Sequence, residues 1–306
     1  MTDFDAVAFI RELEQTGPTE DARTGLDTES LVAADPTLSG VVVTDALVAG
    51  PHGDVPVRVY VDRAIPPTIG LVWVHGGAFI GGTIDMPEAH WVSLYMASRG
   101  IAVVSVEYRK ALHGVHYPVP LDDVVAAWLW VAGDARPLGA TIDRLHLGGA
   151  SAGATLAAGA TARLRDEGLP VPASLILAYP LLHRELPELG QDLLAALATN
   201  PPPINFTPAV VEAFNANYLG PAAGEARYAF LGDTAIRNLP PVLIVNAEAD
   251  ELRASGERFA RQLAEGGLEV TCTTQAGSQH GFLDQPGDAS AVAAMTGFLA
   301  HMHRLR

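Results

Sequence analysis

The sequence has very few cysteines and lysines. Its one cysteine, Cys272, has no second cysteine with which to form an internal disulfide. Its one lysine, Lys110, is among only 19 basic residues, set against 35 acidic ones, and the formal net charge is −16. A surface of that charge repels phosphate backbones and anionic lipid headgroups. We therefore expect partners that are neither nucleic acids nor membranes.

Long hydrophobic runs are also missing. No apolar stretch reaches the roughly 18 residues that a membrane span requires. The first ten residues, MTDFDAVAFI, contain no basic residue and lack the longer apolar stretch of a secretory signal. These absences and the single cysteine lead us to expect a cytoplasmic protein, either a monomer or a homodimer. The composition, with 49% hydrophobic and 18% charged residues, is that of a globular chain with a large core.

Short apolar runs alternate with helical patterns along most of the chain. Two β-branched runs, 41–48 and 55–61, predict an antiparallel pair. Further strands are expected at 70–75, 101–108, 145–149, 174–179, 242–247 and 269–275, and helices at 3–15, 88–98, 121–131, 152–167, 251–265 and 288–303. This alternation predicts a mostly parallel, twisted sheet of eight strands with helices on both faces. A ligand crevice is expected at the carboxyl ends of the strands.

One segment interrupts the alternation. About 60 residues separate the strand ending at 179 from the one starting at 242, and their helix-like parts are divided by Pro201, Pro202 and Pro203. We expect a helical cap here, completed by the N-terminal helix and followed by a connection rich in glycine, proline and threonine. The predicted organisation is 1–40 as the N-terminal part of the cap, 41–182 as core, 183–222 as cap insertion and 223–306 as core.

The stretch GGASAG matches G-x-S-x-G at Gly149, Ser151 and Gly153. An apolar strand precedes it and an alanine-rich helical pattern follows, which is the context in which this motif exposes a nucleophilic serine on a strained turn. Ten serines and 30 glycines in 306 residues give about 0.1 matches by chance, so the motif alone is weak. The alternative is a set of small residues for close helix–strand packing.

The stretch WVHGGAFIGG places small residues directly after a predicted strand. Backbone amides in such a loop can bind the oxyanion of an acyl-transfer reaction. The candidate oxyanion donors are Gly77, Ala78 and Ala152, with Gly76 added as a residue that assists the turn. The alternative is an ordinary tight loop between strand and helix.

Asp250 follows the strand VLIVNA, and His280 follows the strand at 269–275. The order Ser151, Asp250, His280 is the order of a Ser-His-Asp triad in an α/β-hydrolase. Taken singly, Asp250 could cap a helix and His280 could be a loop histidine. Their joint order at the ends of three strands favours the triad.

These motifs resemble those of the hormone-sensitive-lipase-like (bacterial family IV) carboxylesterases, a branch of the α/β-hydrolase fold. The resemblance rests on HGGAF, GASAG, AEADELR, HGF and the segment EYRKALHGVHYPVPLDDVVAAWLWV, and runs from about residue 40 to the end of the chain.

The sequence departs from the family pattern at Ala78, where the family has a third glycine, and at Ala150, where an acidic residue is usual. Leu112 and His113 replace an expected proline and glutamate. His113 and His116 either face the pocket or lie on a surface loop.

The resulting hypothesis is a serine esterase that hydrolyses small, short-acyl esters through Ser151, His280 and Asp250, with no metal or organic cofactor. A lactonase or amidase would use the same triad. A non-catalytic small-molecule receptor of this fold would be expected to lack a triad residue, and none is missing. Phe206, Phe214 and Tyr218 of the cap are expected to shape the substrate pocket.

Overall fold

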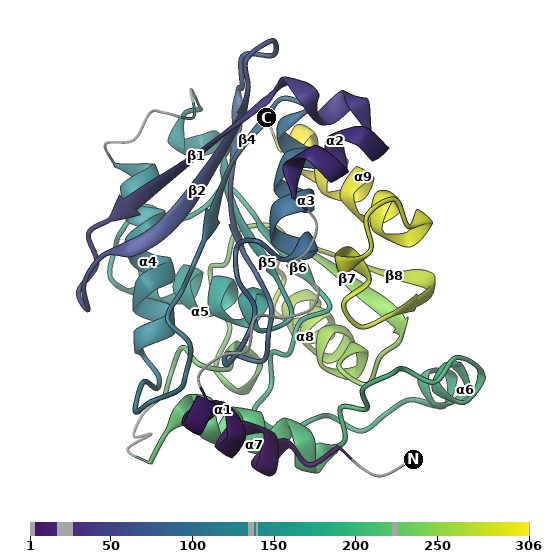
Figure 1. Cartoon of the computed structure of the whole chain (residues 1–306). Coiled ribbons are helices and arrows are strands. Elements are labelled where there is room, and N and C mark those ends of the chain that lie inside the picture. Colours follow the sequence, from purple (N-terminus) through teal and green to yellow (C-terminus); the bar gives the residue numbers. More distant parts are fainter. Residues whose placement is uncertain (1–3, 17–26, 134–137, 139, 222–225, 306) are drawn as a thin grey trace.

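A computed structural model describes residues 4–16, 27–133, 138, 140–221 and 226–305. One sheet of eight strands runs through the molecule in the order β1-β2-β4-β3-β5-β6-β7-β8 (Figure 1). The strands are β1 Val41–Val48, β2 Val55–Asp62, β3 Ile69–Val74, β4 Ile101–Val106, β5 Leu145–Ala150, β6 Leu175–Ala178, β7 Val242–Ala249 and β8 Val270–Gln279. Among the described strands, β2 runs antiparallel to both of its neighbours, β1 and β4, and every other neighbouring pair is parallel, so the prediction of a mostly parallel sheet is confirmed.

Helices cover both faces of the sheet, as the alternating pattern predicts. On one face α2, α3 and α9 pack over a cluster that contains Trp73, Trp91 and Phe298, and on the other α4, α5 and α8 pack over a second cluster. The α-helices are α1 Ala6–Thr16, α2 Thr28–Ala34, α3 Pro87–Ala97, α4 Val119–Ala132, α5 Ala152–Asp166, α6 Gln191–Thr199, α7 Pro208–Leu219, α8 Arg253–Glu265 and α9 Ala289–Arg304. Short 3₁₀ turns are η2 Pro36–Gly40, η4 Ile142–Arg144, η5 Leu231–Asp233 and η6 Phe282–Asp284.

The central strands are buried along their whole length. Every residue of β3, β4 and β5 is buried, because helices cover both sides of each strand. The alanine-rich sequence of α5 allows close packing. A Cβ added to Gly159 would lie 2.1 Å from the carbonyl oxygen of Tyr228, so only glycine fits there.

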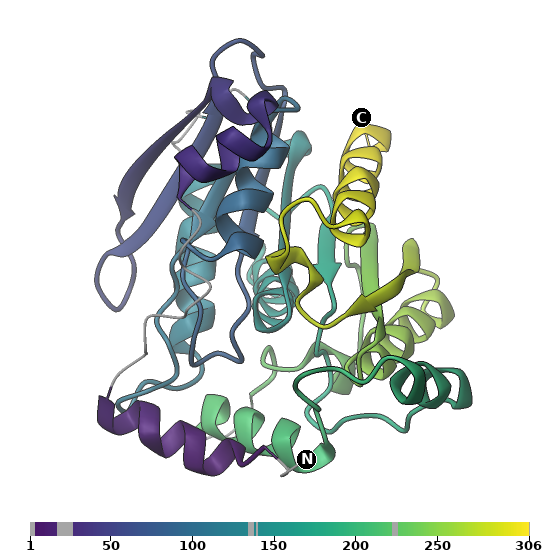
Figure 2. The same cartoon turned by 45° about the vertical axis from the view of Figure 1, so that its right-hand side comes forward.

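Two helices from distant parts of the chain lie side by side below the carboxyl edge of the sheet. Figures 1 and 2 show α1 and α7 adjacent in both views, with α6 further to one side. The rings of Phe4 and Phe214 approach within 6.4 Å between their centroids. The insertion therefore carries two helices, α6 and α7, and the N-terminal helix lies against the second of them.

The segment 28–40 lies elsewhere. Helix α2 is not predicted by the residue pattern, which indicates only a connection after α1. Asp27 caps it by accepting a hydrogen bond from the Ser30 amide at 2.7 Å. Leu31 and Leu38 are buried in the cluster with Trp91 of α3, on a face of the sheet rather than with α1 and α7. The expected N-terminal cap region 1–40 is thus divided between two places in the molecule.

Candidate active site

Ser151 lies on a tight turn between β5 and α5. Its backbone angles, φ 51° and ψ −120°, are those that a non-glycine residue rarely adopts. A Cβ on Gly149 would lie 2.6 Å from the carbonyl carbon and oxygen of Gly153, and a Cβ on Gly153 would lie 2.1 Å from the carbonyl oxygen of Val74. The turn therefore requires glycine two residues before and two residues after the serine. These contacts give the G-x-S-x-G pattern a steric cause.

The structure brings Ser151, His280 and Asp250 together. The Nε2 atom of His280 lies 2.9 Å from the Oγ of Ser151, and its Nδ1 lies 2.7 Å from the Oδ2 of Asp250. The other Asp250 oxygen accepts a hydrogen bond from the Leu252 amide at 3.0 Å. Because a carboxylate only accepts, Nδ1 of His280 carries the proton and Nε2 is free to accept one from the serine.

Neighbouring carboxylates set the proton affinity of His280. Burial lowers the pKa of this imidazole, but the nearby carboxylates, chiefly Asp250 through its charge and its hydrogen bond, together raise the pKa above the ordinary value of 6.5. Glu88 and Asp284 act in the same direction. These carboxylates therefore stabilise the imidazolium that His280 would form on accepting a proton from Ser151.

The loop after β3 has an unusual backbone. Gly77, Ala78 and Phe79 have φ angles of 113°, 52° and 65° in succession. Within the described part of the chain, the N–H groups of Gly77, Ala78 and Ala152 donate to no other protein group. Ala78 and Ala152 line the same cavity as Ser151. Three unpaired amides beside the serine are the donors that an oxyanion would need.

Gly76 differs from the other three predicted oxyanion residues. Its N–H donates to a carboxylate oxygen of Glu88, so this amide is already engaged. Its carbonyl oxygen accepts from the hydroxyl of Tyr108 at 3.1 Å and from Nδ1 of His75 at 2.7 Å. Gly76 therefore anchors the loop, in keeping with its expected role in the turn, and is not available as an oxyanion donor.

Lys110, the single lysine, fixes the tautomer of His75. Its Nζ lies 3.0 Å from Nε2 of His75 and 2.7 Å from a carboxylate oxygen of Glu107. An ammonium only donates, so Nε2 accepts and Nδ1 keeps the proton that it donates to Gly76. Burial and the charge of Lys110 both lower the pKa of His75, which keeps the imidazole neutral. Lys110 stands out in the sequence only as the single lysine, and no residue pattern there predicts this contact.

The cavity at Ser151 is small and almost entirely apolar. Its volume is about 20 Å³, where roughly 10–15 Å³ are needed to hold one water molecule. Phe206, which precedes α7, and Phe214 of α7 line it, as expected. Tyr218 does not line it and instead stacks on Phe79, with 4.0 Å between ring centroids. The remaining lining residues are Ala78, Phe79, Ser151, Ala152, Leu181, Val211, Asn215 and Leu252.

The two histidines of the loop after β4 do not line this cavity. His113 is half-exposed and pairs with Glu14 of α1 at 3.4 Å. The Nδ1 of His116 donates to the carbonyl of Asn217 at 2.8 Å. The two residues thus join the loop after β4 to α1 and to α7. The described residues contain no cluster of three or more histidine, cysteine, aspartate or glutamate side chains placed to hold a metal ion.

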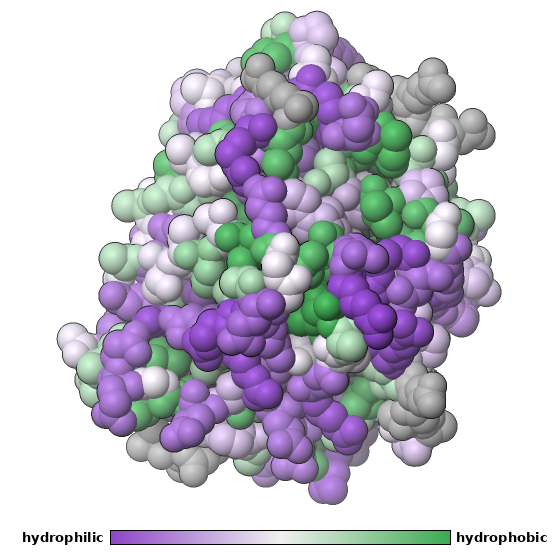
Figure 3. Space-filling model, turned by 180° about the vertical axis from the view of Figure 1, so that it is seen from behind, coloured by the Kyte–Doolittle hydropathy of each residue, from purple (hydrophilic) through white to green (hydrophobic). Residues whose placement is uncertain are grey.

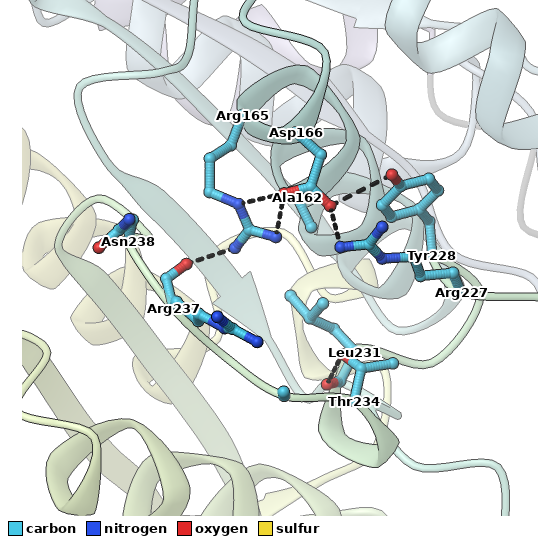
Figure 4. A pocket seen from close by; sticks show the side chains of 10 residues that line it. Ala162, Arg165, Asp166, Arg227, Tyr228, Leu231, Thr234, Arg237 and Asn238 are labelled. Carbon is cyan, nitrogen blue, oxygen red and sulfur yellow. Dashed lines mark hydrogen bonds and ion pairs between the residues drawn. The ribbon is translucent and has the colours of Figure 1, made fainter.

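A larger pocket lies away from Ser151, at the opposite end of α5 (Figure 4). Asp166 is at its centre and pairs with Arg165 and Arg227, each at 2.7 Å. The hydroxyl of Tyr228 donates to the same carboxylate at 3.2 Å. Two of the guanidinium groups at this pocket are therefore already paired with a carboxylate. The pocket shares no residue with the cavity at Ser151.

Comparisons with known proteins identify the fold and the family. A family model described as alpha/beta hydrolase fold matches residues 71–284. Esterase LipI of Mycobacterium tuberculosis is 32% identical over 83% of this chain and 79% of its own length. Carboxylesterase NlhH of the same organism is 30% identical over 80% of this chain and 76% of its own. The solved structure of an esterase from Pyrobaculum calidifontis superposes with a TM-score of 0.76 at 24% identity, covering 99% of this chain and 94% of that one.

The chain therefore belongs to the hormone-sensitive-lipase-like branch of the α/β-hydrolase fold, and its class of activity is that of a carboxylic ester hydrolase. None of the described helices has the length and apolar character needed to cross a bilayer.

Proposed function

We propose that the protein is a serine carboxylesterase in which Ser151 is the nucleophile, His280 the general base and acid, and Asp250 the residue that orients His280. The hydrogen-bonded chain from Asp250 through His280 to Ser151 carries this proposal. The amides of Gly77, Ala78 and Ala152 are the proposed oxyanion donors. The proposed cap consists of α1 and the insertion 183–222, over a core formed by 41–182 and 223–306.

The reaction follows from the geometry. Ser151 Oγ attacks the ester carbonyl carbon as its proton moves to Nε2 of His280. The tetrahedral intermediate places its oxyanion among the three amides and then expels the alcohol, which takes the proton from His280. Water attacks the acyl-enzyme and gives a proton to His280, which returns it to Ser151 as the acid leaves. No step requires a metal or an organic cofactor.

A short acyl group is the proposed substrate preference. The cavity beside Ser151 has a volume of about 20 Å³, and Phe206, Val211 and Phe214 are among the residues that enclose it, so a short acyl group fits it better than a long one. On the face that Figure 3 shows, apolar residues lie in separate groups among hydrophilic ones. Such a face offers no broad apolar area for a lipid droplet.

Hydrolysis of a series of aryl esters from acetate to octanoate tests the proposal. Turnover should be highest for the shortest acyl groups and should be lost in Ser151→Ala. A lactone and an anilide measured alongside separate an esterase from a lactonase or amidase with the same triad. Equal turnover of Ser151→Ala and the unaltered protein would contradict the proposal.

A further inference from the structure

Glu88 is a buried acidic residue at the second position of α3, with 2% of its surface exposed, and no step of the reaction above uses it. We propose that Glu88 is a positioning residue that holds the oxyanion loop and the aromatic wall behind His280 in one fixed arrangement. The inference rests on the proposed function, since it concerns the same reaction.

Both oxygens of the Glu88 carboxylate accept hydrogen bonds from the active-site walls. One accepts from the N–H of Gly76, and the other accepts from the hydroxyl of Tyr179 at 2.6 Å. The backbone N–H of Glu88 in turn donates to Asp284, four residues after His280, at 3.2 Å. Glu88 thus joins three separate segments: the loop after β3, the end of β6 and the loop that carries His280.

The contact with Gly76 bears on the oxyanion donors. Residues with positive φ, such as Ala78 and Phe79, persist only where the surroundings fix the backbone. Glu88 anchors the N–H of Gly76, and Tyr108 anchors its carbonyl. The carbonyl of Gly76 and the N–H of Gly77 belong to the same planar trans peptide and point in opposite directions. The hydrogen bonds that fix this carbonyl therefore also fix the direction of the Gly77 N–H. Glu88 therefore helps to aim an oxyanion donor that it does not touch.

The contact between Glu88 and Tyr179 affects His280, the proposed general base. The Tyr179 ring is fully buried and meets the His280 imidazole edge-on, with 4.8 Å and 63° between the two rings. The hydrogen bond to Glu88 holds the far end of this ring. A rotation of Tyr179 would remove the surface on which the imidazole rests while it points at Ser151.

The position of Glu88 is also relevant to Ala150, the residue at which the sequence departs from the family pattern. The family resemblance leads us to expect a carboxylate there, and Ala150 is instead a buried apolar residue. A Cβ on Gly76 would lie 2.6 Å from the Glu88 carboxylate and 3.2 Å from the Ala150 carbonyl oxygen, so both residues flank the same glycine. The buried carboxylate in contact with Gly76 is therefore that of Glu88 in α3, and not one from position 150.

The charge of Glu88 acts on the pKa of His280, which can be measured and which a purely packing role of Glu88 would leave unchanged. The acidic groups that face His280 are Asp250, Glu251, Glu88 and Asp284. Burial lowers the pKa of His280, but Asp250, Glu88 and Asp284 raise it, and together they outweigh burial. Removing the charge at position 88 should therefore lower the pKa of His280 and move the acid limb of kcat/KM to lower pH.

The experiment compares Glu88→Gln, which keeps the size of the side chain but not its charge, with Glu88→Ala. The turnover rate for an aryl acetate is divided by the concentration of active sites that react with a fluorophosphonate. Unfolded protein, which does not react, is thereby excluded from the rate per site. We expect kcat to fall on the order of 10-fold in Glu88→Gln and up to roughly 10²-fold in Glu88→Ala, the size of an oxyanion-donor defect, with KM changed by less than about threefold. The acid limb of Glu88→Gln should lie at lower pH.

His90→Gln is the matched control. His90 lies two residues further along α3, is buried, and hydrogen-bonds Tyr60 and Thr28 rather than the active site. It should lower the melting temperature and leave kcat per site and the pH profile unchanged. If Glu88→Gln also keeps wild-type kcat per site and an unmoved acid limb, the positioning role is overturned while ester hydrolysis stands. If the unaltered protein has no Ser151-dependent esterase activity, the proposed function fails, and the inference with it.

Discussion

His280 Nε2 and Ser151 Oγ lie 2.9 Å apart, although 129 positions separate the two residues in the sequence. They follow β8 and β5, strands that β6 and β7 separate in the sheet. The parallel strands bring their carboxyl ends to one edge, and the turn after β5 lifts the serine toward the loop after β8. This contact depends on the whole fold, and the activity of the protein should depend on this contact.

Asp250→Asn should reduce kcat by about 10⁴-fold while the protein stays folded. The asparagine keeps the shape of the side chain but removes the charge that stabilises the imidazolium, and it favours the wrong tautomer of His280. Turnover of an aryl acetate and a circular dichroism spectrum of the same sample measure the two effects. A loss of less than about tenfold would show that His280 does not need Asp250.

The acid limb of the kcat/KM profile should have its midpoint above pH 6.5. The general base must be neutral to accept the serine proton, and the carboxylates around His280, chiefly Asp250, outweigh its burial and raise its pKa above that ordinary value. Activity should therefore be complete at high pH and should fall as the pH drops through the raised pKa. A profile measured from pH 5 to 9 tests this, and a midpoint well below 6.5 is the opposite result.

Val211→Ala should shift the acyl preference toward longer chains. Val211 of α7 lines the cavity at Ser151, and its replacement removes two methyl groups from the wall. Each methylene that the enlarged cavity admits should raise the relative kcat/KM of the longer ester by about fourfold, from roughly 0.8 kcal/mol per buried methylene.

Val210→Ala is the control for this change. Val210 is the adjacent residue of the same helix and is equally buried, but it does not line the cavity. It should lower stability without altering the chain-length profile. The same shift in both variants would mean that loosening of α7, rather than the volume of the cavity, sets the preference.

Gly153→Ala and Gly297→Ala should have opposite effects on stability. A Cβ at Gly153 would lie 2.1 Å from the Val74 carbonyl oxygen, so the turn that presents Ser151 must be displaced. A Cβ at Gly297 in α9 meets nothing within 4 Å, so alanine there should stabilise the helix by roughly 0.5–1 kcal/mol. Thermal unfolding should show a lower melting temperature for the first variant and a higher one for the second. Stabilisation by Gly153→Ala would remove the steric explanation of the motif.

The mostly parallel sheet and the nucleophile turn could be predicted because their causes are local in sequence. Continuous apolar runs indicate buried parallel strands, and two glycines around a serine indicate a turn too tight for a Cβ. The strands end within a few residues of the predicted positions, and β8 alone extends four residues beyond, to Gln279.

The parts that escaped prediction depend on contacts between distant segments. Nothing in the local sequence PEAHW shows that Glu88 reaches Gly76 and Tyr179, which lie 12 and 91 positions away. The engagement of the Gly76 amide was missed for the same reason. Tyr218 was expected at the pocket, but its hydrophobic environment and stacking on Phe79 are tertiary features that residue type does not encode.

Labelling of the unaltered protein with a fluorophosphonate, followed by peptide mass spectrometry, tests whether Ser151 is the nucleophile. We expect one adduct per chain, on the peptide that contains Ser151, with esterase activity lost in proportion to labelling and no adduct in Ser151→Ala or on unfolded protein. Full esterase activity in a protein whose Ser151 is completely labelled would show that a different group is the nucleophile.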